Sequence, residues 1–232
     1  EIGLPIHFHT HDTSGISAAS VLAAVDAGID AVDGALDSMS GLTSQPNLGA
    51  MAAAVAGSDR DSGLNLDNLQ ELSHYWEGVR RYYAPFEADM RSGTQSVYRH
   101  EMPGGQFTNL REQARAIGLE HRWPQVEKAY AEVNLLFGDI IKVTPTSKVV
   151  GDMALYMVSH GLTAEEVADP NKEVAFPNSV VSLFKGEIGF PADGFPEAMT
   201  KKVLKGGKPM EGRAGKYLAA VDLEAKRAEV AT

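Results

Sequence analysis

Three histidines at alternate positions open the chain: His7, His9 and His11. If residues 6–10 form a strand, its two-residue period places these imidazoles on one face. An alanine-rich helical pattern follows directly over residues 17–27, with Thr13, Ser14 and Ser17 as candidate caps. A strand that runs into a helix, with polar residues at its carboxyl end, is typical of the chemistry-bearing end of an α/β barrel.

A second unit of the same kind follows. Residues 31–36 alternate as a strand does, residues 37–46 form a polar loop, and residues 47–56 form an alanine-rich helical pattern that stops at Gly57. In parallel βα units the two loops open on the same side of the sheet. A further short strand is predicted at residues 64–66.

The fold class predicted from these units is α/β. Two or three strands cannot close a barrel, because each open edge would leave unpaired backbone groups. The chain also lacks Met at position 1 and begins almost inside a strand. We therefore expect upstream sequence that supplies the remaining strands.

The pattern changes to helices beyond residue 66. Leu69, Leu72, Trp76, Val79 and Tyr83 are spaced as the apolar side of a long amphipathic helix. Further helices are predicted at residues 109–117, from Pro124 to Gly138, from Thr144 to Gly161, at 164–167, 179–184 and 196–204, and in the charged tail from residue 216. The helical spacing predicts inward faces for two of them: Val126, Tyr130, Val133 and Phe137 in the helix from Pro124, and Val150, Met153 and Met157 in the helix from Thr144. We divide the chain into barrel strands (1–66), a helical region (67–206) and a charged helical linker (207–232).

The composition excludes several classes of protein. The formal net charge of -10 argues against nucleic acid or an anionic membrane surface as a partner. The absence of cysteine excludes disulfides and thiolate metal sites. No run reaches the roughly 18 apolar residues of a membrane span, and no signal-peptide pattern opens the chain. We expect a cytoplasmic protein.

The clustered histidines have two interpretations. Neutral imidazoles are the commonest nitrogen ligands for a transition metal. Alternatively, they are polar groups at a strand end that hydrogen-bond to backbone carbonyls. The residues alone leave both open.

Four sequence blocks together resemble the carboxyltransferase domain of the pyruvate carboxylase family. They are HTHDTSG at residues 9–15, DSMSGLTSQP at 37–46, HEMPGGQ at 100–106 and KVTPTSKVVGD at 142–152. The wider family includes the α subunit of oxaloacetate decarboxylase and the transcarboxylase subunit. The serine-rich loop at 37–46 is more similar to the pyruvate carboxylases.

The resemblance implies the last strands of a (βα)8 TIM barrel followed by a helical funnel. It implies a divalent metal, Zn²⁺ or Mn²⁺, held by His9 and His11 together with an aspartate and a carbamylated lysine that have no counterpart in this chain. The family does not use a histidine matching His7 as a ligand, and we expect it to be packed inside the barrel. Two imidazoles alone leave a first-row ion short of ligands.

The resemblance also implies roles for the 142–152 block. Thr144 would pass a proton between pyruvate and biotin, and Ser147 and Lys148 would lie near the biotin ureido group. The residues alone offer another interpretation of Thr144, a helix cap before Pro145 worth about 1 kcal/mol. The remaining histidines are interpreted as structural: His74, His100, His121 and His160.

The reaction implied is transfer of CO2 from carboxybiotin to pyruvate, which forms oxaloacetate. Biotin would sit on a carrier domain and ATP would be used by a domain, both outside this chain. The other expected partners are the N-terminal half of the barrel and further copies in a homo-oligomer. Two rivals remain: a metal-dependent hydrolase, which would need further histidines on later strands, and a non-catalytic scaffold fragment.

Overall fold

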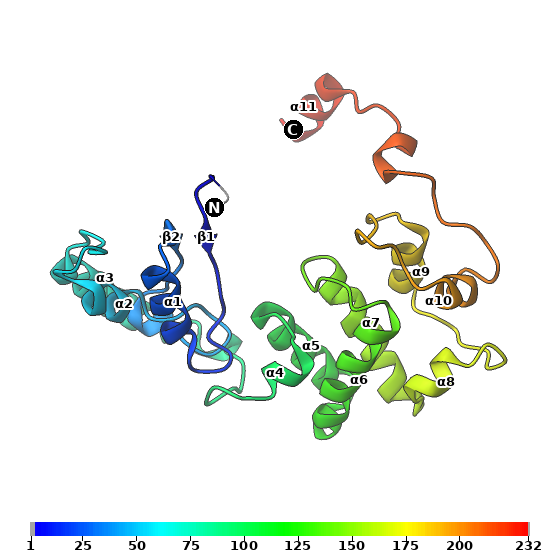
Figure 1. The fold of residues 1–232 in the computed structure, drawn as a ribbon, viewed down its shortest axis with the longest axis horizontal. Coiled ribbons are helices and arrows are strands. Elements are labelled where there is room, and N and C mark those ends of the chain that lie inside the picture. Colours follow the sequence, from blue (N-terminus) through cyan, green and yellow to red (C-terminus); the bar gives the residue numbers. More distant parts are fainter. Residues whose placement is uncertain (1–2, 232) are drawn as a thin grey trace.

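The computed structural model describes residues 3–231 and begins with two parallel strands (Figure 1). β1 (His7–Phe8) pairs with β2 (Ala31–Val32) in the register His7 to Ala31 and Phe8 to Val32. Each strand is shorter than predicted, and a separate parallel bridge joins Ala35, beyond β2, to Asn47. The helices α1 (Ser17–Asp26) and α2 (Leu48–Val55) follow the strands as predicted. The two βα units are therefore confirmed.

The start of α1 differs from the prediction. Ile16 occupies the N-cap position, so none of the three predicted caps fills it. The carboxylate of Asp12 instead accepts the Ser17 N–H at 2.9 Å, and the Ser17 hydroxyl donates to the His11 carbonyl at 2.7 Å. The start of α1 is thus hydrogen-bonded to His11 and Asp12, which follow β1. These bonds fix the turn that carries His11.

Helices make up most of the remaining chain. Their bounds are α3 (Leu66–Arg80), α4 (Val97–His100), α5 (Gly104–Ala116), α6 (Trp123–Leu136), α7 (Thr146–His160), α8 (Ala164–Ala168), α9 (Asn178–Lys185), α10 (Glu197–Val203) and α11 (Leu223–Val230). Short 3-10 segments occur at Asp37–Met39, Ala84–Phe86, Glu120–Arg122 and Ala214–Tyr217. The strand predicted at residues 64–66 is wrong, because Asn65 caps α3 through its side chain. α5 begins five residues earlier than the predicted residue 109.

The hydrophobic core lies in the helical region between Met102 and Val203. α6 packs on α7, and the predicted inward faces are confirmed: Val126, Tyr130, Val133, Val150, Met153 and Met157 are all at most 1% exposed. Gly138, which follows α6, has φ of +97°, a conformation that glycine adopts at low cost. These helices therefore bury most of the hydrophobic core in the described part of the chain.

α3 lies apart from this core. It packs on α2 and on the 3-10 segment Asp37–Met39, and Arg80 at its end donates to the Ser38 carbonyl. Its predicted apolar face is wrong in part, since Leu72 and Tyr83 are 49% and 54% exposed. The predicted domain boundary at residue 66 stays a prediction. α3, which begins at this boundary, contacts the βα units that precede it.

The described part of the chain is mostly helical. Within residues 3–231 the sheet consists of β1 and β2, so an eight-stranded barrel is not contained in them. The segment after α10 extends away from the other helices as far as α11 (Figure 1). No helix in the described range is long and apolar enough to cross a lipid bilayer.

Candidate functional site at the carboxyl ends of the strands

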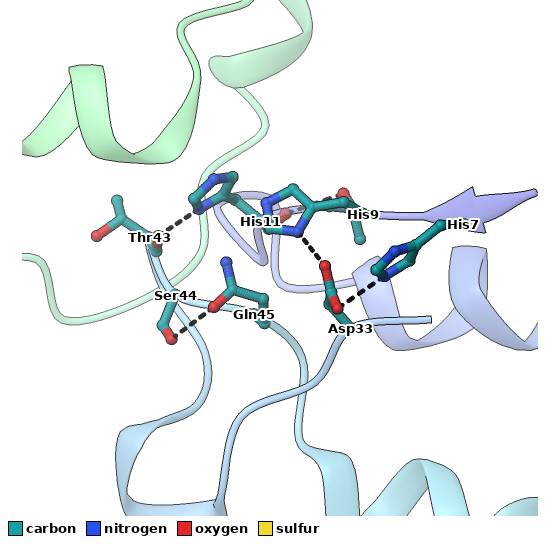
Figure 2. Close-up of polar contacts among 8 residues, drawn as sticks. His7, His9, His11, Asp33, Thr43, Ser44 and Gln45 are labelled. Atoms are coloured by element: carbon teal, nitrogen blue, oxygen red, sulfur yellow. Dashed lines mark hydrogen bonds and ion pairs between the residues drawn. The ribbon is translucent and has the colours of Figure 1, made fainter. Parts of the chain in front are cut away.

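The histidines at the end of β1 share a carboxylate from the neighbouring strand. The Nδ1 atom of His9 lies 2.6 Å from Oδ2 of Asp33, and Nε2 of His7 lies 2.8 Å from Oδ1 (Figure 2). Asp33 directly follows β2, and its N–H donates to the Phe8 carbonyl at 3.2 Å. The parallel register therefore places Asp33 beside His9.

Asp33 is an anion in this arrangement. Hydrogen bonds from His9, and secondarily from His7, lower the pKa of the Asp33 carboxyl group. An ionised carboxylate only accepts hydrogen bonds. In the neutral imidazole of His9 the proton is therefore on Nδ1, and Nε2 carries a free lone pair.

A backbone carbonyl holds His11 in the same tautomer, with the proton on Nδ1. Its Nδ1 donates to the Thr43 carbonyl at 2.6 Å, and a carbonyl oxygen cannot donate. The ring centroids of His9 and His11 lie 5.2 Å apart, and the rings are nearly perpendicular. Figure 2 shows the two side chains next to each other. Both histidines thus combine an occupied Nδ1 with a lone pair on Nε2, the state in which imidazole binds a metal.

The prediction that His7 packs inside the barrel concerns a complete barrel, which the described residues do not contain, and it stays a prediction. In the described residues its side chain is 59% exposed and bonds Asp33 through Nε2. The sequence reasoning also missed Asp33. The signal that could have found it is its place within the second predicted strand, residues 31–36, where it comes level with His9 in a parallel pair.

One backbone hydrogen bond ties the histidine turn to the serine-rich loop at residues 37–46, and another closes that loop. The Asp12 N–H donates to the Ser44 carbonyl at 2.7 Å, and the Gly41 N–H donates to the Gln45 carbonyl at 2.8 Å within that loop. The loops of the two βα units therefore form one surface. Across residues 3–231, no group of three or more potential metal ligands is found.

The amino end of α5 packs directly on the site. A Cβ atom at Gly104 would lie 2.6 Å from Nδ1 of His11 and 2.8 Å from the Thr43 carbonyl oxygen, whereas one at Gly105 would meet nothing within 4 Å. The Thr108 hydroxyl, one turn further, donates to the Thr43 hydroxyl at 2.8 Å. The close approach requires glycine at position 104.

We expect Gly104→Ala to destabilise the protein by about 1–3 kcal/mol, because the added methyl group overpacks the contact. The Gly105→Ala variant is the matched control and should be neutral or stabilising by up to about 1 kcal/mol, since alanine favours the helix. Denaturant unfolding of both variants checks this. Equal stability of the two would show that His11 moves aside freely.

Thr144 precedes α7 and is exposed. The cap interpretation of Thr144 is wrong: Pro145 occupies the N-cap position of α7. The hydroxyl that fixes this turn belongs to Thr146, which donates to the Ile141 carbonyl at 2.6 Å and accepts from the Val143 N–H at 3.2 Å. The helix start therefore has its own side-chain bonds, and these leave Thr144 without a capping role.

The other two predicted residues of this block differ in environment. Ser147 is buried, at 4% exposure, and Tyr130 donates to its carbonyl at 3.4 Å. Lys148 is exposed, and its Nζ bonds Oδ2 of Asp152 at 2.7 Å. Over residues 3–231, neither these residues nor Thr144 share a hydrogen bond or ion pair with the histidines. α5 connects the histidines to this block of residues, because its amino end contacts His11 and the helix packs on α7.

His100 is structural, as predicted. It is 2% exposed, and its Nδ1 accepts the Met102 N–H at 3.0 Å. Burial lowers the pKa of His100 to about 4, so the ring is neutral near pH 7. It stacks near Phe107 and joins α4 to α5.

Comparison with known proteins identifies relatives of nearly the whole chain. Residues 97–232 match the family described as "Conserved carboxylase domain". Pyruvate carboxylase of Bacillus subtilis is 50% identical over 228 residues, which cover 98% of this chain and 20% of that protein. The mitochondrial pyruvate carboxylase of Homo sapiens is 48% identical and is covered to 19%. The chain thus spans about a fifth of the length of these relatives.

Solved structures of pyruvate carboxylase also match nearly the whole chain. The carboxyl transferase domain of Rhizobium etli pyruvate carboxylase, solved with pyruvate and biocytin, superposes with a TM-score of 0.94 at 60% identity, covering 98% of this chain and 38% of that one. The complete multifunctional enzyme from the same organism superposes with the same TM-score and is covered to 22%.

Proposed function

The chain belongs to the conserved carboxylase domain family, and from that membership we propose that it is part of the carboxyltransferase of a biotin-dependent pyruvate carboxylase. The observation that carries the proposal is the match of 98% of the chain, at 60% identity, to a carboxyl transferase domain solved with pyruvate and biocytin. The complete enzyme would contain this chain within a protein about five times as long, as the share of the curated relatives suggests.

The proposed reaction joins CO2 from carboxybiotin to pyruvate and forms oxaloacetate. The biotin carrier domain and the ATP-using domain would lie outside this chain, as would the first strands of a (βα)8 barrel. In this proposal β1 and β2 are the last barrel strands, residues 67–206 form the helical funnel, and residues 207–232 lead to a further module. The cytoplasmic location and the homo-oligomer stay predictions.

A divalent metal fits the two histidines. His9 and His11 hold Nδ1 in hydrogen bonds to acceptors and keep Nε2 for a ligand bond, which is the donor state that Zn²⁺ or Mn²⁺ needs. A bound divalent ion would act as a Lewis acid toward the pyruvate carbonyl. The remaining ligands would come from outside the described residues, consistent with the absence of a third ligand among residues 3–231.

Thr144 would move the proton. In the proposed step its hydroxyl passes a proton from the pyruvate methyl group to the biotin nitrogen that has released CO2, and the carbon freed of that proton bonds to the CO2. Its exposure and its freedom from capping support this role. Lys148 and Ser147, one helical turn on, would bind near the biotin ureido group, and the amino end of α7 favours negative charge there.

The proposal is tested on the complete enzyme by following oxaloacetate formation from pyruvate, bicarbonate and ATP with a coupled reduction of oxaloacetate. We expect oxaloacetate formation that stops when biotin is sequestered by avidin. Turnover of pyruvate that avidin leaves unchanged, or no oxaloacetate from a fully biotinylated protein, would contradict the proposed function.

A further inference from the structure

We propose that Asp33 is a positioning residue that sets the tautomer and orientation of His9 for metal binding, and that His7 holds Asp33 in place. The inference deepens the proposed function and rests on its metal site. The sequence motifs that support the family resemblance do not include Asp33.

The hydrogen bond between Asp33 and His9 is the first step. Oδ2 of Asp33 lies 2.6 Å from Nδ1 of His9. A carboxylate on one ring nitrogen keeps the proton there and increases the basicity of the other nitrogen. It also stops rotation of the ring about χ2. His9 therefore presents Nε2 in one direction before a metal arrives.

Comparison with His11 shows why His9 needs a side-chain partner. His11 has the Thr43 carbonyl on its Nδ1 and Gly104 against its ring, so the backbone of two loops holds it. His9 is more open, with 53% of its side chain exposed. The carboxylate of Asp33 therefore holds the ring of His9 in place, as the packed loops hold the ring of His11.

His7 completes the arrangement from the other side. Its Nε2 lies 2.8 Å from Oδ1 of Asp33, so each carboxylate oxygen has one imidazole partner, as Figure 2 shows. Two partners on opposite oxygens fix the plane of the carboxylate. Because His7 is bonded through Nε2, it is oriented as a support for Asp33, whereas His9 is oriented as a ligand.

An ordinary surface ion pair is the competing explanation, since all three side chains are well exposed. The two explanations predict different results. A surface pair contributes little to stability and nothing to metal affinity. A positioning carboxylate changes metal affinity while stability stays nearly constant.

The test measures the Zn²⁺ dissociation constant of the complete enzyme by competition with a chromophoric chelator. We expect Asp33→Ala to weaken Zn²⁺ binding by about 10- to 100-fold. Asp33→Asn keeps an acceptor oxygen and should lose less. Asp30→Ala is the matched control: Asp30 directly precedes β2, and its carboxylate accepts the backbone N–H of Ile6 at 2.7 Å rather than a bond from a histidine ring. Its removal should leave the dissociation constant unchanged.

Two further variants separate the parts of the proposal. His7→Ala should weaken Zn²⁺ binding less than Asp33→Ala, and it should add nothing in the Asp33→Ala background, because His7 acts through Asp33. If the losses of Zn²⁺ binding free energy in the two single variants add up in the Asp33→Ala, His7→Ala double variant, the role proposed for His7 is overturned. Unchanged affinity in both Asp33 variants, with His9→Ala losing the metal, would overturn the inference alone. Unchanged affinity in His9→Ala would instead overturn the metal site of the proposed function.

Discussion

Replacing Thr144 with alanine should reduce carboxyl transfer to pyruvate in the complete enzyme by about 10²- to 10⁴-fold, the usual contribution of a positioned proton donor and acceptor. Alanine cannot carry the proton from the pyruvate methyl group. The measurement is oxaloacetate formation under saturating pyruvate. ATP-dependent carboxylation of biotin, which would occur in another domain, should continue at the parental rate.

Because Thr144 does not cap α7 in the structure, the Thr144→Ala variant tests catalysis without a loss of helix stability. Pro145 holds the N-cap position of α7, so Thr144→Ala should melt close to the parent. Thr144→Ser keeps a hydroxyl and should retain measurable transfer, although serine lacks the methyl group that restricts the rotamer. Near-parental oxaloacetate formation by Thr144→Ala would show that the catalytic assignment is wrong.

Thr146 provides the matched control two residues away. Its hydroxyl bonds the Ile141 carbonyl and the Val143 N–H. Thr146→Ala should therefore lower the free energy of unfolding by about 1 kcal/mol, a loss that Thr144→Ala does not share. A larger loss of stability in Thr144→Ala than in Thr146→Ala would return Thr144 to a structural role.

Removing both proposed metal ligands should have the other large effect. The His9→Ala, His11→Ala double variant of the complete enzyme should lose most of its divalent metal, because two of the lone pairs that bind the ion are gone. Lewis-acid stabilisation is worth several kcal/mol, so carboxyl transfer should fall by more than about 10³-fold. Elemental analysis of the purified protein measures the metal directly.

His7→Ala is the control for that experiment. Its Nε2 is bonded to Asp33, so the variant should be purified with its metal even though its affinity is lower. Full metal occupancy in the double variant would defeat the assignment of His9 and His11. A loss of metal from His7→Ala that exceeds the loss from Asp33→Ala would make His7 a ligand.

Much of the fold could be predicted from the sequence where the pattern is long and regular. The apolar spacing on α6 and α7 predicted side chains that are fully buried, such as Val126 and Met153, because a helix in a core must bury a face of that period. The two βα units were predicted from alternating strand patterns that are each followed by an alanine-rich helical pattern. α3 was predicted as a helix but not as one so exposed, because periodicity gives the apolar face and not the partner that covers it.

The details of the turns could not be predicted in the same way. Thr144 before Pro145 has the composition of a cap, but the chain starts α7 one residue later and uses Thr146. Asp12, rather than one of the three hydroxyl residues nearby, accepts the first N–H of α1. Several side chains in each turn could satisfy the free N–H groups, and the local backbone decides between them.

The two candidate ligand histidines could be picked out from the sequence, and the carboxylate bonded to one of them could not. His9 and His11 stand out in the sequence because they alternate, and the structure brings their rings together. Asp33 lies 24 residues after His9 and is recognisable only through the register of two strands. The remaining ligands of the proposed site are not among the described residues, so no reasoning from this chain alone completes it.

Exchange of the pyruvate methyl protons with solvent deuterium, followed by NMR in the complete enzyme with biotin present, tests the central claim most directly. The claim is that this chain supplies the proton-transfer residue and two metal ligands of a carboxyltransferase. We predict that the parent exchanges these protons and that Thr144→Ala and the His9→Ala, His11→Ala double variant are each slower by at least about 10²-fold. Exchange at the parental rate in both variants would contradict the account.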